Sequence, residues 1–538
     1  MSGPIADRPQ PSSRGIRAAL AGICVGAALL AGAWVFLVPI FQAPDEPMHL
    51  DYALSIASAG HLLNARENPI VQSKVDAVVH PDSRYLMQAT GWSRVYADYE
   101  QRMAPGYGTL TYFQQLDLKA PSHALDRPPT QTPGLLAVYP AGYYALLAAW
   151  IRLIALVTPS LSLLFFSARI LSALLLPLTL LLSYAVAREL GIKPRLALLL
   201  VAAIGFFPIT PFMASAVQPD NLAWFLLSLA MYLGLVARRQ GQPAPLLGGL
   251  GLVLGALLFT KLQFAACAAI PLLSTLLTER LRKPARTPLA VAAALVGLPG
   301  MAFLGVHLWV VWGTTVPLSP TTAGIPSPSQ GVPNAAAFSA AVTQGLLPFT
   351  VYAGGSILRA VFDFYLGGQS FRTFWGTVGW LEAPLQFGLA PINALVRALE
   401  VTWTLAVMGL VSAHFASTGL RLARVALNHR KAVALRLCFS DPLLASYMIF
   451  TAFMFGMFVL TDGTFLPQGR NWLPFLLPTW MLALRYAPRM LRRHRPVLAV
   501  SFARVTAGAL ILFCVAGSAF ALATLEHRFY GAFPTFSG

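Results

Sequence analysis

The chain has 538 residues, of which 57% are hydrophobic and only 11% are charged, and its mean hydropathy is +0.64. Soluble domains hold about 45–50% apolar and about 25% charged residues, so this composition excludes an ordinary soluble enzyme, a disordered chain and a coiled coil, and it predicts a polytopic membrane protein. The formal net charge of +18 would suggest nucleic-acid binding in a soluble protein, but here its distribution along the chain has to be considered first.

The predicted elements begin with a basic segment, 1–17, and a first apolar run at about 18–40. No small-residue cleavage site follows that run, so we interpret it as a retained membrane helix. After a polar stretch, further apolar runs lie near 135–157, 163–187, 196–213, 221–236, 246–260, 262–278, 288–311, 385–413, 442–460, 472–484 and 497–520. Because a spanning helix needs about 20 apolar residues, these runs predict an all-α integral membrane protein with about eleven transmembrane helices.

The run at 135–157 determines the topology. If it lies in the membrane interface, the inner segments hold 22 of the 38 Lys and Arg residues but only 4 of the 20 acidic residues. Those inner segments are 1–17, 188–195, 237–245, 279–287, 414–441 and 485–496. Because cytoplasmic loops carry the excess of Lys and Arg, we predict that 135–157 does not span and that the N-terminus is cytoplasmic. The positive charge is then a topology signal, and no nucleic-acid partner is expected.

This topology divides the chain into alternating membrane and outer regions. The first helix, 18–40, leads into a large outer loop with interfacial helices. Following that loop at 41–162, the chain comprises helices two to seven over 163–311, a second outer loop with interfacial helices over 312–384, helices eight to eleven over 385–520, and an outer tail over 521–538.

A cluster of polar residues follows the first helix, at Pro44–His49. Asp45 is a good helix N-cap, so one interpretation is a capped interfacial helix with solvated acids. Two adjacent carboxylates, Asp45 and Glu46, with His49 within one turn also suit a general base and its orienting partner. Both interpretations stay open at this point.

Further polar residues are expected on the same outer face. Asp220 and Asn221 precede the fourth helix, where they serve either as N-cap groups or as substrate ligands. Lys261 interrupts an apolar stretch, and a cation at membrane depth is a functional candidate unless it snorkels to the headgroups. Arg470 either lies in an aromatic belt or binds phosphate oxygens.

Two further candidate residues are expected on the outer face, where a divalent cation is also considered. Trp380 lies in an aromatic segment of the second outer loop, as an interface anchor or a substrate contact. Arg169, near the start of the second helix, would pair with an acid or with a ligand phosphate. The four cysteines lack CxxC or zinc spacing, and no dense ligand cluster is visible. A divalent cation, Mg or Mn, bridging Asp45 or Asp220 to a phosphate stays open.

The order of these motifs resembles a bacterial family of multi-pass membrane proteins of uncharacterised function, which is itself similar to the GT-C glycosyltransferase superfamily. The resemblance implies that Asp45 or Glu46 is a catalytic base, that Asp220 is a second acid, and that the donor is a sugar on polyprenyl phosphate. Met48 and Asn471 depart from the family pattern, which commonly has a small residue and a Tyr there. The motifs that carry the resemblance are Pro44-Asp45-Glu46-Pro47-x-His49, Tyr139-Pro140-x-x-Tyr143-Tyr144, Ala168-Arg169, Gln218-Pro219-Asp220, Thr260-Lys261, Gly379-Trp380-Leu381 and Gln468-Gly469-Arg470.

The resemblance therefore implies an inverting hexosyl or pentosyl transferase of the bacterial inner membrane with its site facing the periplasm. Asp45, with Glu46 and His49, would deprotonate an envelope glycan, lipid or protein acceptor, while cations hold the donor phosphate; those cations are Lys261, Arg470 and Arg169. The rival interpretation is a transporter or flippase of a lipid-linked sugar or another anionic lipid, which the lack of internal repeats argues against. A scaffold or sensor with an outer domain near 41–134 is a third interpretation.

Overall fold

The computed structural model describes the segments that form the membrane bundle. They are residues 13–38, 43, 46–62, 140–158, 161–241, 243–269, 296–306, 377–378, 383–384, 398, 401–402, 409, 442–460, 469–482, 484 and 496–530. Within them the chain is almost wholly helical. Two short strands, β1 (Thr377–Val378) and β2 (Ala383–Pro384), pair antiparallel.

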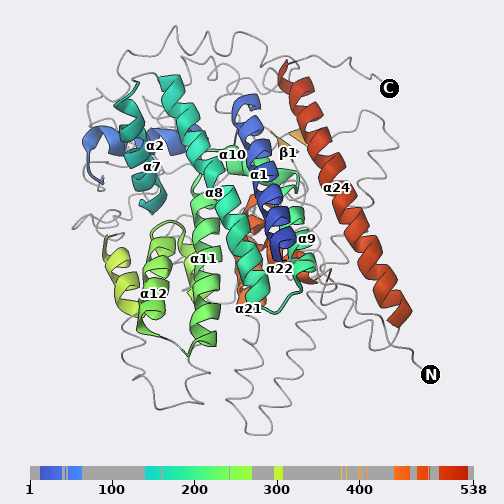
Figure 1. Cartoon of the computed structure of the whole chain (residues 1–538). Coiled ribbons are helices and arrows are strands. Elements are labelled where there is room, and N and C mark those ends of the chain that lie inside the picture. Colours follow the sequence, from blue (N-terminus) through green and yellow to red (C-terminus); the bar gives the residue numbers. More distant parts are fainter. Residues whose placement is uncertain are drawn as a thin grey trace.

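Most described helices lie in the first half of the chain (Figure 1). They are α1 (Ser13–Leu37), α2 (Glu46–Ala59), α7 (Gly142–Ala155), α8 (Leu161–Glu189), α9 (Pro194–Gly205), α10 (Ile209–Ser215), α11 (Pro219–Arg239) and α12 (Ala244–Leu258). A further helix covers Val296–Val306. The C-terminal part contributes α21 (Pro442–Leu460), the 3₁₀-helix η6 (Gly469–Phe475), α22 (Leu476–Met481) and α24 (Pro496–Tyr530).

Four of the described helices are long and apolar enough to cross a membrane. They are Arg14–Leu37, Leu163–Glu189, Pro219–Arg239 and Arg504–Ala523. Large apolar side chains such as Leu29, Leu174 and Leu512 are exposed along three of them, as lipid contact requires. The predicted helical membrane protein is therefore confirmed, whereas the count of eleven spans stays a prediction.

The apolar run predicted at 196–213 is a broken helix. It forms α9 and α10, which are bent by 61° around Phe206–Pro208. Pro208 has no backbone N–H and disfavours helical geometry in the residue before it, so it ends the first helix. Two side chains of α24 donate to carbonyls beside the break: the Cys514 thiol to Ala203 and the Ser518 hydroxyl to Phe206. The break is thus stabilised by hydrogen bonds from a helix remote in sequence.

Helix α7 covers Gly142–Ala155 of the run at 135–157, whose position in the membrane interface stays a prediction. With 14 residues this helix is about 21 Å long, which is shorter than a bilayer core of about 30 Å. It packs beside α2, and both lie near the same end of the bundle, next to α8 (Figure 1). The side of the membrane on which they lie stays a prediction.

Candidate functional site

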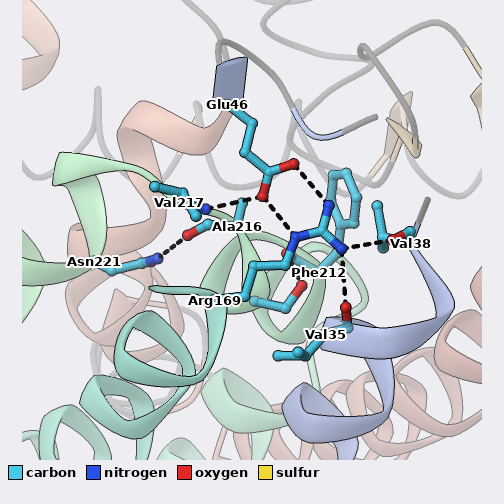
Figure 2. A network of polar contacts seen from close by, with 9 residues as sticks. Val35, Val38, Glu46, Arg169, Phe212, Ala216, Val217 and Asn221 are labelled. Carbon is cyan, nitrogen blue, oxygen red and sulfur yellow. Dashed lines mark hydrogen bonds and ion pairs between the residues drawn. The ribbon is translucent and has the colours of Figure 1, made fainter. Parts of the chain in front are cut away.

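A fully buried ion pair joins the start of α2 to α8. Arg169 Nε and Nη2 donate to Glu46 Oε1 and Oε2, each over 2.7 Å, and neither side chain is exposed (Figure 2). Such bidentate pairs are among the strong hydrogen-bonded contacts in proteins. Of the two alternatives for Arg169, the structure shows the pairing with an acid.

The pair also binds three backbone groups from two other segments. Arg169 Nη1 donates to the carbonyls of Val35 and Val38 at the end of α1, over 2.9 and 2.5 Å. The Val217 N–H, in the segment between α10 and α11, donates to Glu46 Oε1 over 3.1 Å. A buried ion pair is tolerated when its remaining polar groups are satisfied in this way. Glu46 and Arg169 therefore fix four segments relative to one another.

Asn221 closes the end of the broken helix. Its Nδ2 donates to the carbonyls of Met213, Ala214 and Ala216, at 3.0, 3.3 and 3.1 Å. These carbonyls belong to the end of α10 and the residue after it, where intrahelical donors are missing. Within the motif Gln218–Asn221, the residue at the N-cap of α11 is Gln218, whose side chain makes no capping hydrogen bond. Asn221 lies inside the helix and bonds backward to α10 and the residue after it.

A second ion pair lies where α11 begins and α12 ends. Lys261 Nζ contacts Asp220 Oδ1, and it lies 5.3 Å from the centroid of the Phe264 ring. The Lys261 side chain is 16% exposed and that of Asp220 is 7% exposed, in contrast to the sealed pair at Glu46. An ammonium group has three protons to donate, so a lysine can contact an anion and a carboxylate at the same time.

Helix α7 brings these separate motifs together. The Gly142 N–H donates to the carbonyl of Phe259 over 2.8 Å, next to Thr260-Lys261. Tyr143 Oη lies 3.0 Å from Ser172 Oγ of α8, and His49 Nδ1 lies 2.9 Å from Tyr144 Oη. Three consecutive residues of α7 thus contact three different regions of the candidate site.

The surroundings of Tyr143 keep its hydroxyl protonated. Burial raises the pKa of its hydroxyl, and the nearby charge of Glu46 raises that pKa further, while hydrogen bonds with Ser172 and the Gln218 backbone lower it. The phenol therefore stays neutral and keeps its proton for hydrogen bonding. Tyr143 and Tyr144 were not among the predicted site residues, although the Tyr139-Pro140-x-x-Tyr143-Tyr144 motif of the resemblance was a signal that could have found them.

The remaining predicted site residues lie partly or wholly outside the described residues. Asp45 and Trp380 belong to that group. Arg470 lies in η6, which packs against α10 and α11, but its side chain is outside the described part. Among the described residues, no three His, Cys, Asp or Glu side chains gather as metal ligands. The roles of Asp45, Trp380 and Arg470 stay predictions.

Comparison with known sequences places the chain in a family. The family described as Predicted membrane protein (DUF2142) matches residues 28–479, which is most of the chain and includes every described site residue. The chain belongs to this family. Membership confirms the family resemblance that the order of the motifs predicted. Among curated proteins, none matches this chain.

Solved structures similar to this family member include two from Archaeoglobus fulgidus. Its oligosaccharyltransferase tethered with an acceptor peptide is 13% identical, with a TM-score of 0.39 over 95% of this chain and 55% of that chain. The oligosaccharyltransferase AglB in complex with an inhibitory peptide and a dolichol-phosphate is 12% identical, with a TM-score of 0.38 over 95% and 56%. This chain therefore spans just over half the length of those proteins. Function has to be argued from the site itself.

Proposed function

We propose that this protein is a GT-C-type membrane glycosyltransferase that moves a sugar from a polyprenyl-phosphate donor to an envelope glycan, lipid or protein. The observation that carries the proposal is the pair of the partly exposed Lys261 with the buried Asp220, at the point where α7, α11 and α12 meet. A lysine in a largely apolar setting is costly, and such cations are by default functional. A donor phosphate is a ligand that such a cation would bind.

The proposed reaction is a single displacement. The acceptor hydroxyl gives its proton to Asp45, and its oxygen bonds to the anomeric carbon from the side opposite the phosphate. The bond between that carbon and the phosphate oxygen breaks, and polyprenyl phosphate leaves with the electron pair, so the transferred hexose or pentose is inverted. Lys261 and Arg470 stabilise the charge of the leaving phosphate, and such contacts are strongest where water is excluded.

The adjacent acids take different parts in this proposal. Glu46 uses both carboxylate oxygens on Arg169 and the Val217 N–H, so it positions the start of α2. Asp45, the residue directly before Glu46 in the sequence, is the acid that we propose as the base. Arg169 orients Glu46 instead of holding the donor phosphate. We place this site on the periplasmic face of a bacterial inner membrane, in agreement with the charge distribution.

The test uses the full chain in nanodiscs with a polyprenyl-phosphate hexose that is radiolabelled in the sugar. Release of sugar-free polyprenyl phosphate, with the label in an acceptor or in water, supports a transferase. Movement of the intact labelled lipid between leaflets without cleavage would instead establish the flippase. Parallel reactions with EDTA and with added Mg or Mn test the divalent cation.

Variants of two cations localise the activity. Lys261→Ala should weaken donor use, because the donor phosphate would lose the ammonium group that we propose binds it. Arg239→Ala is the matched control, since Arg239 pairs with Glu189 and its side chain is 63% exposed. Equal donor use by both variants would remove Lys261 from the site.

A further inference from the structure

Helix α2 is held against α7 along its length. At its C-terminal end, Arg152 Nε of α7 donates to the Ala57 carbonyl over 2.8 Å. The chain then leaves α2 through Gly60, whose φ of +81° favours glycine. A Cβ there would lie 2.9 Å from Arg152 Nη2, so the turn and the arginine fit closely. The position of α2 is therefore set by α7 as well as by the Glu46–Arg169 pair.

The second polar link between these helices is the contact of His49 with Tyr144. Nδ1 of His49 lies 2.9 Å from Tyr144 Oη, and the two residues are 5% and 0% exposed. In a dry environment a hydrogen bond of this kind holds a ring in one orientation, because breaking it leaves a buried polar atom unpaired. His49 lies one turn after Asp45, on the same helical face if α2 extends that far.

Tyr52 provides an internal comparison. Its ring centroid lies 4.5 Å from that of Tyr144, and it is equally buried. Within the described part of the chain, Tyr52 Oη makes no hydrogen bond. The two tyrosines thus share one apolar environment, but only Tyr144 contacts the imidazole through its hydroxyl. Replacing each by Phe separates the hydrogen bond from the packing.

We infer that Tyr144 is a positioning residue of the transfer site and acts through His49; this inference rests on the proposed function. The Tyr144 hydroxyl contacts Nδ1 and so holds the imidazole ring of His49, the residue proposed to assist the base, in one orientation. Helix α7, which holds none of the acids and cations predicted from the sequence for the reaction, thereby sets the geometry of the proposed base.

The experiment measures the ¹⁵N NMR resonances of the His49 ring. Full-length protein with ¹⁵N-labelled imidazole rings is placed in nanodiscs, and the His49 signals are assigned by their loss in His49→Gln. Tyr144→Phe should move the Nδ1 resonance of His49 and lower sugar transfer about tenfold, as the loss of one buried hydrogen bond predicts. Tyr52→Phe should leave both unchanged. An unmoved His49 resonance in Tyr144→Phe overturns the inference.

A double-variant comparison keeps the inference testable if Tyr144→Phe lowers stability. When His49→Gln is already present, adding Tyr144→Phe should reduce transfer no further, because both changes remove the same contact. Independent, multiplying losses overturn the positioning role. Wild-type protein that transfers no sugar overturns the proposed function, whereas the NMR comparison still reports the hydrogen bond by itself.

Discussion

At the scale of single residues, the exposure of the two ion pairs separates structural from chemical roles. Glu46 and Arg169 are fully enclosed, and their contacts are directed to backbone and to each other. The side chain of Lys261 is 16% exposed, whereas its partner Asp220 is buried. We therefore assign the proposed chemistry to Lys261 and Asp45, and the proposed support to Glu46.

Asp45→Asn tests the base. The change keeps the shape of the side chain and removes its charge, so the protein should fold while transfer falls by about 10²- to 10⁴-fold. Transfer of labelled sugar by purified protein is the measurement, with thermal unfolding in detergent as the control for folding. Full transfer by Asp45→Asn would exclude this residue as the base.

Glu46→Gln should behave differently from Asp45→Asn. It leaves the Arg169 guanidinium buried without its counter-charge, and loss of one partner of such a pair costs about 3–5 kcal/mol. We expect a lowered unfolding temperature, and a smaller loss when Glu46→Gln is combined with Arg169→Met. If Glu46→Gln abolishes transfer at wild-type stability, Glu46 is itself the chemical group.

At the scale of elements, α7 is the short helix that carries the contacts between motifs. Its first residue, Gly142, lies against the end of α12, so closely that a Cβ would be 2.7 Å from the Phe259 carbonyl oxygen. Backbone at that distance cannot rotate away as a side chain would. The glycine is therefore required for α7 and α12 to approach at Thr260-Lys261.

Gly142→Ala tests this contact. The added methyl group should push α7 from α12, lowering the free energy of unfolding by about 1–3 kcal/mol and weakening donor use. Gly248→Ala within α12 is the matched control, because its Cβ meets nothing within 4 Å and alanine favours helix. Denaturation of both variants in one detergent provides the comparison; equal stability would show that α7 tolerates a shift.

At the scale of the whole molecule, the proposed site requires that the helix ends carrying its described residues lie at the same end of the bundle. Glu46, Arg169, Asp220 and Lys261 lie near the end of α1, the start of α8, the start of α11 and the end of α12. These helix ends are at one side of a bundle only if the chain alternates direction as predicted. The described contacts satisfy that condition.

Cysteine labelling tests which side this is. His61→Cys should react with an impermeant maleimide in intact spheroplasts, whereas Lys193→Cys and Arg239→Cys should react only after lysis. These positions are exposed, unlike Asn221, whose buried side chain would not report sidedness. Three native cysteines are buried, and Cys438 would be replaced by Ser. Labelling of position 193 but not 61 from outside would reverse the orientation.

The membrane class and the course of most described helices were determined by the sequence alone. The hydrophobicity of a segment depends only on its own consecutive residues, so an apolar run of sufficient length predicts a membrane helix without knowledge of its neighbours in the fold. The same local pattern predicted the run at 196–213 but not its bend, where the side-chain donors come from α24, a helix remote in sequence.

The partners within the candidate site were decided only by the tertiary structure. Glu46 and Arg169 are 123 residues apart, and His49 and Tyr144 are 95 apart. Nothing in a local pattern tells whether an arginine near a helix start will meet an acid or a phosphate, because that depends on which helices pack together. Sequence identified the charged groups worth considering; the packing of α2, α7 and α8 decided which of them are sealed and which stay accessible.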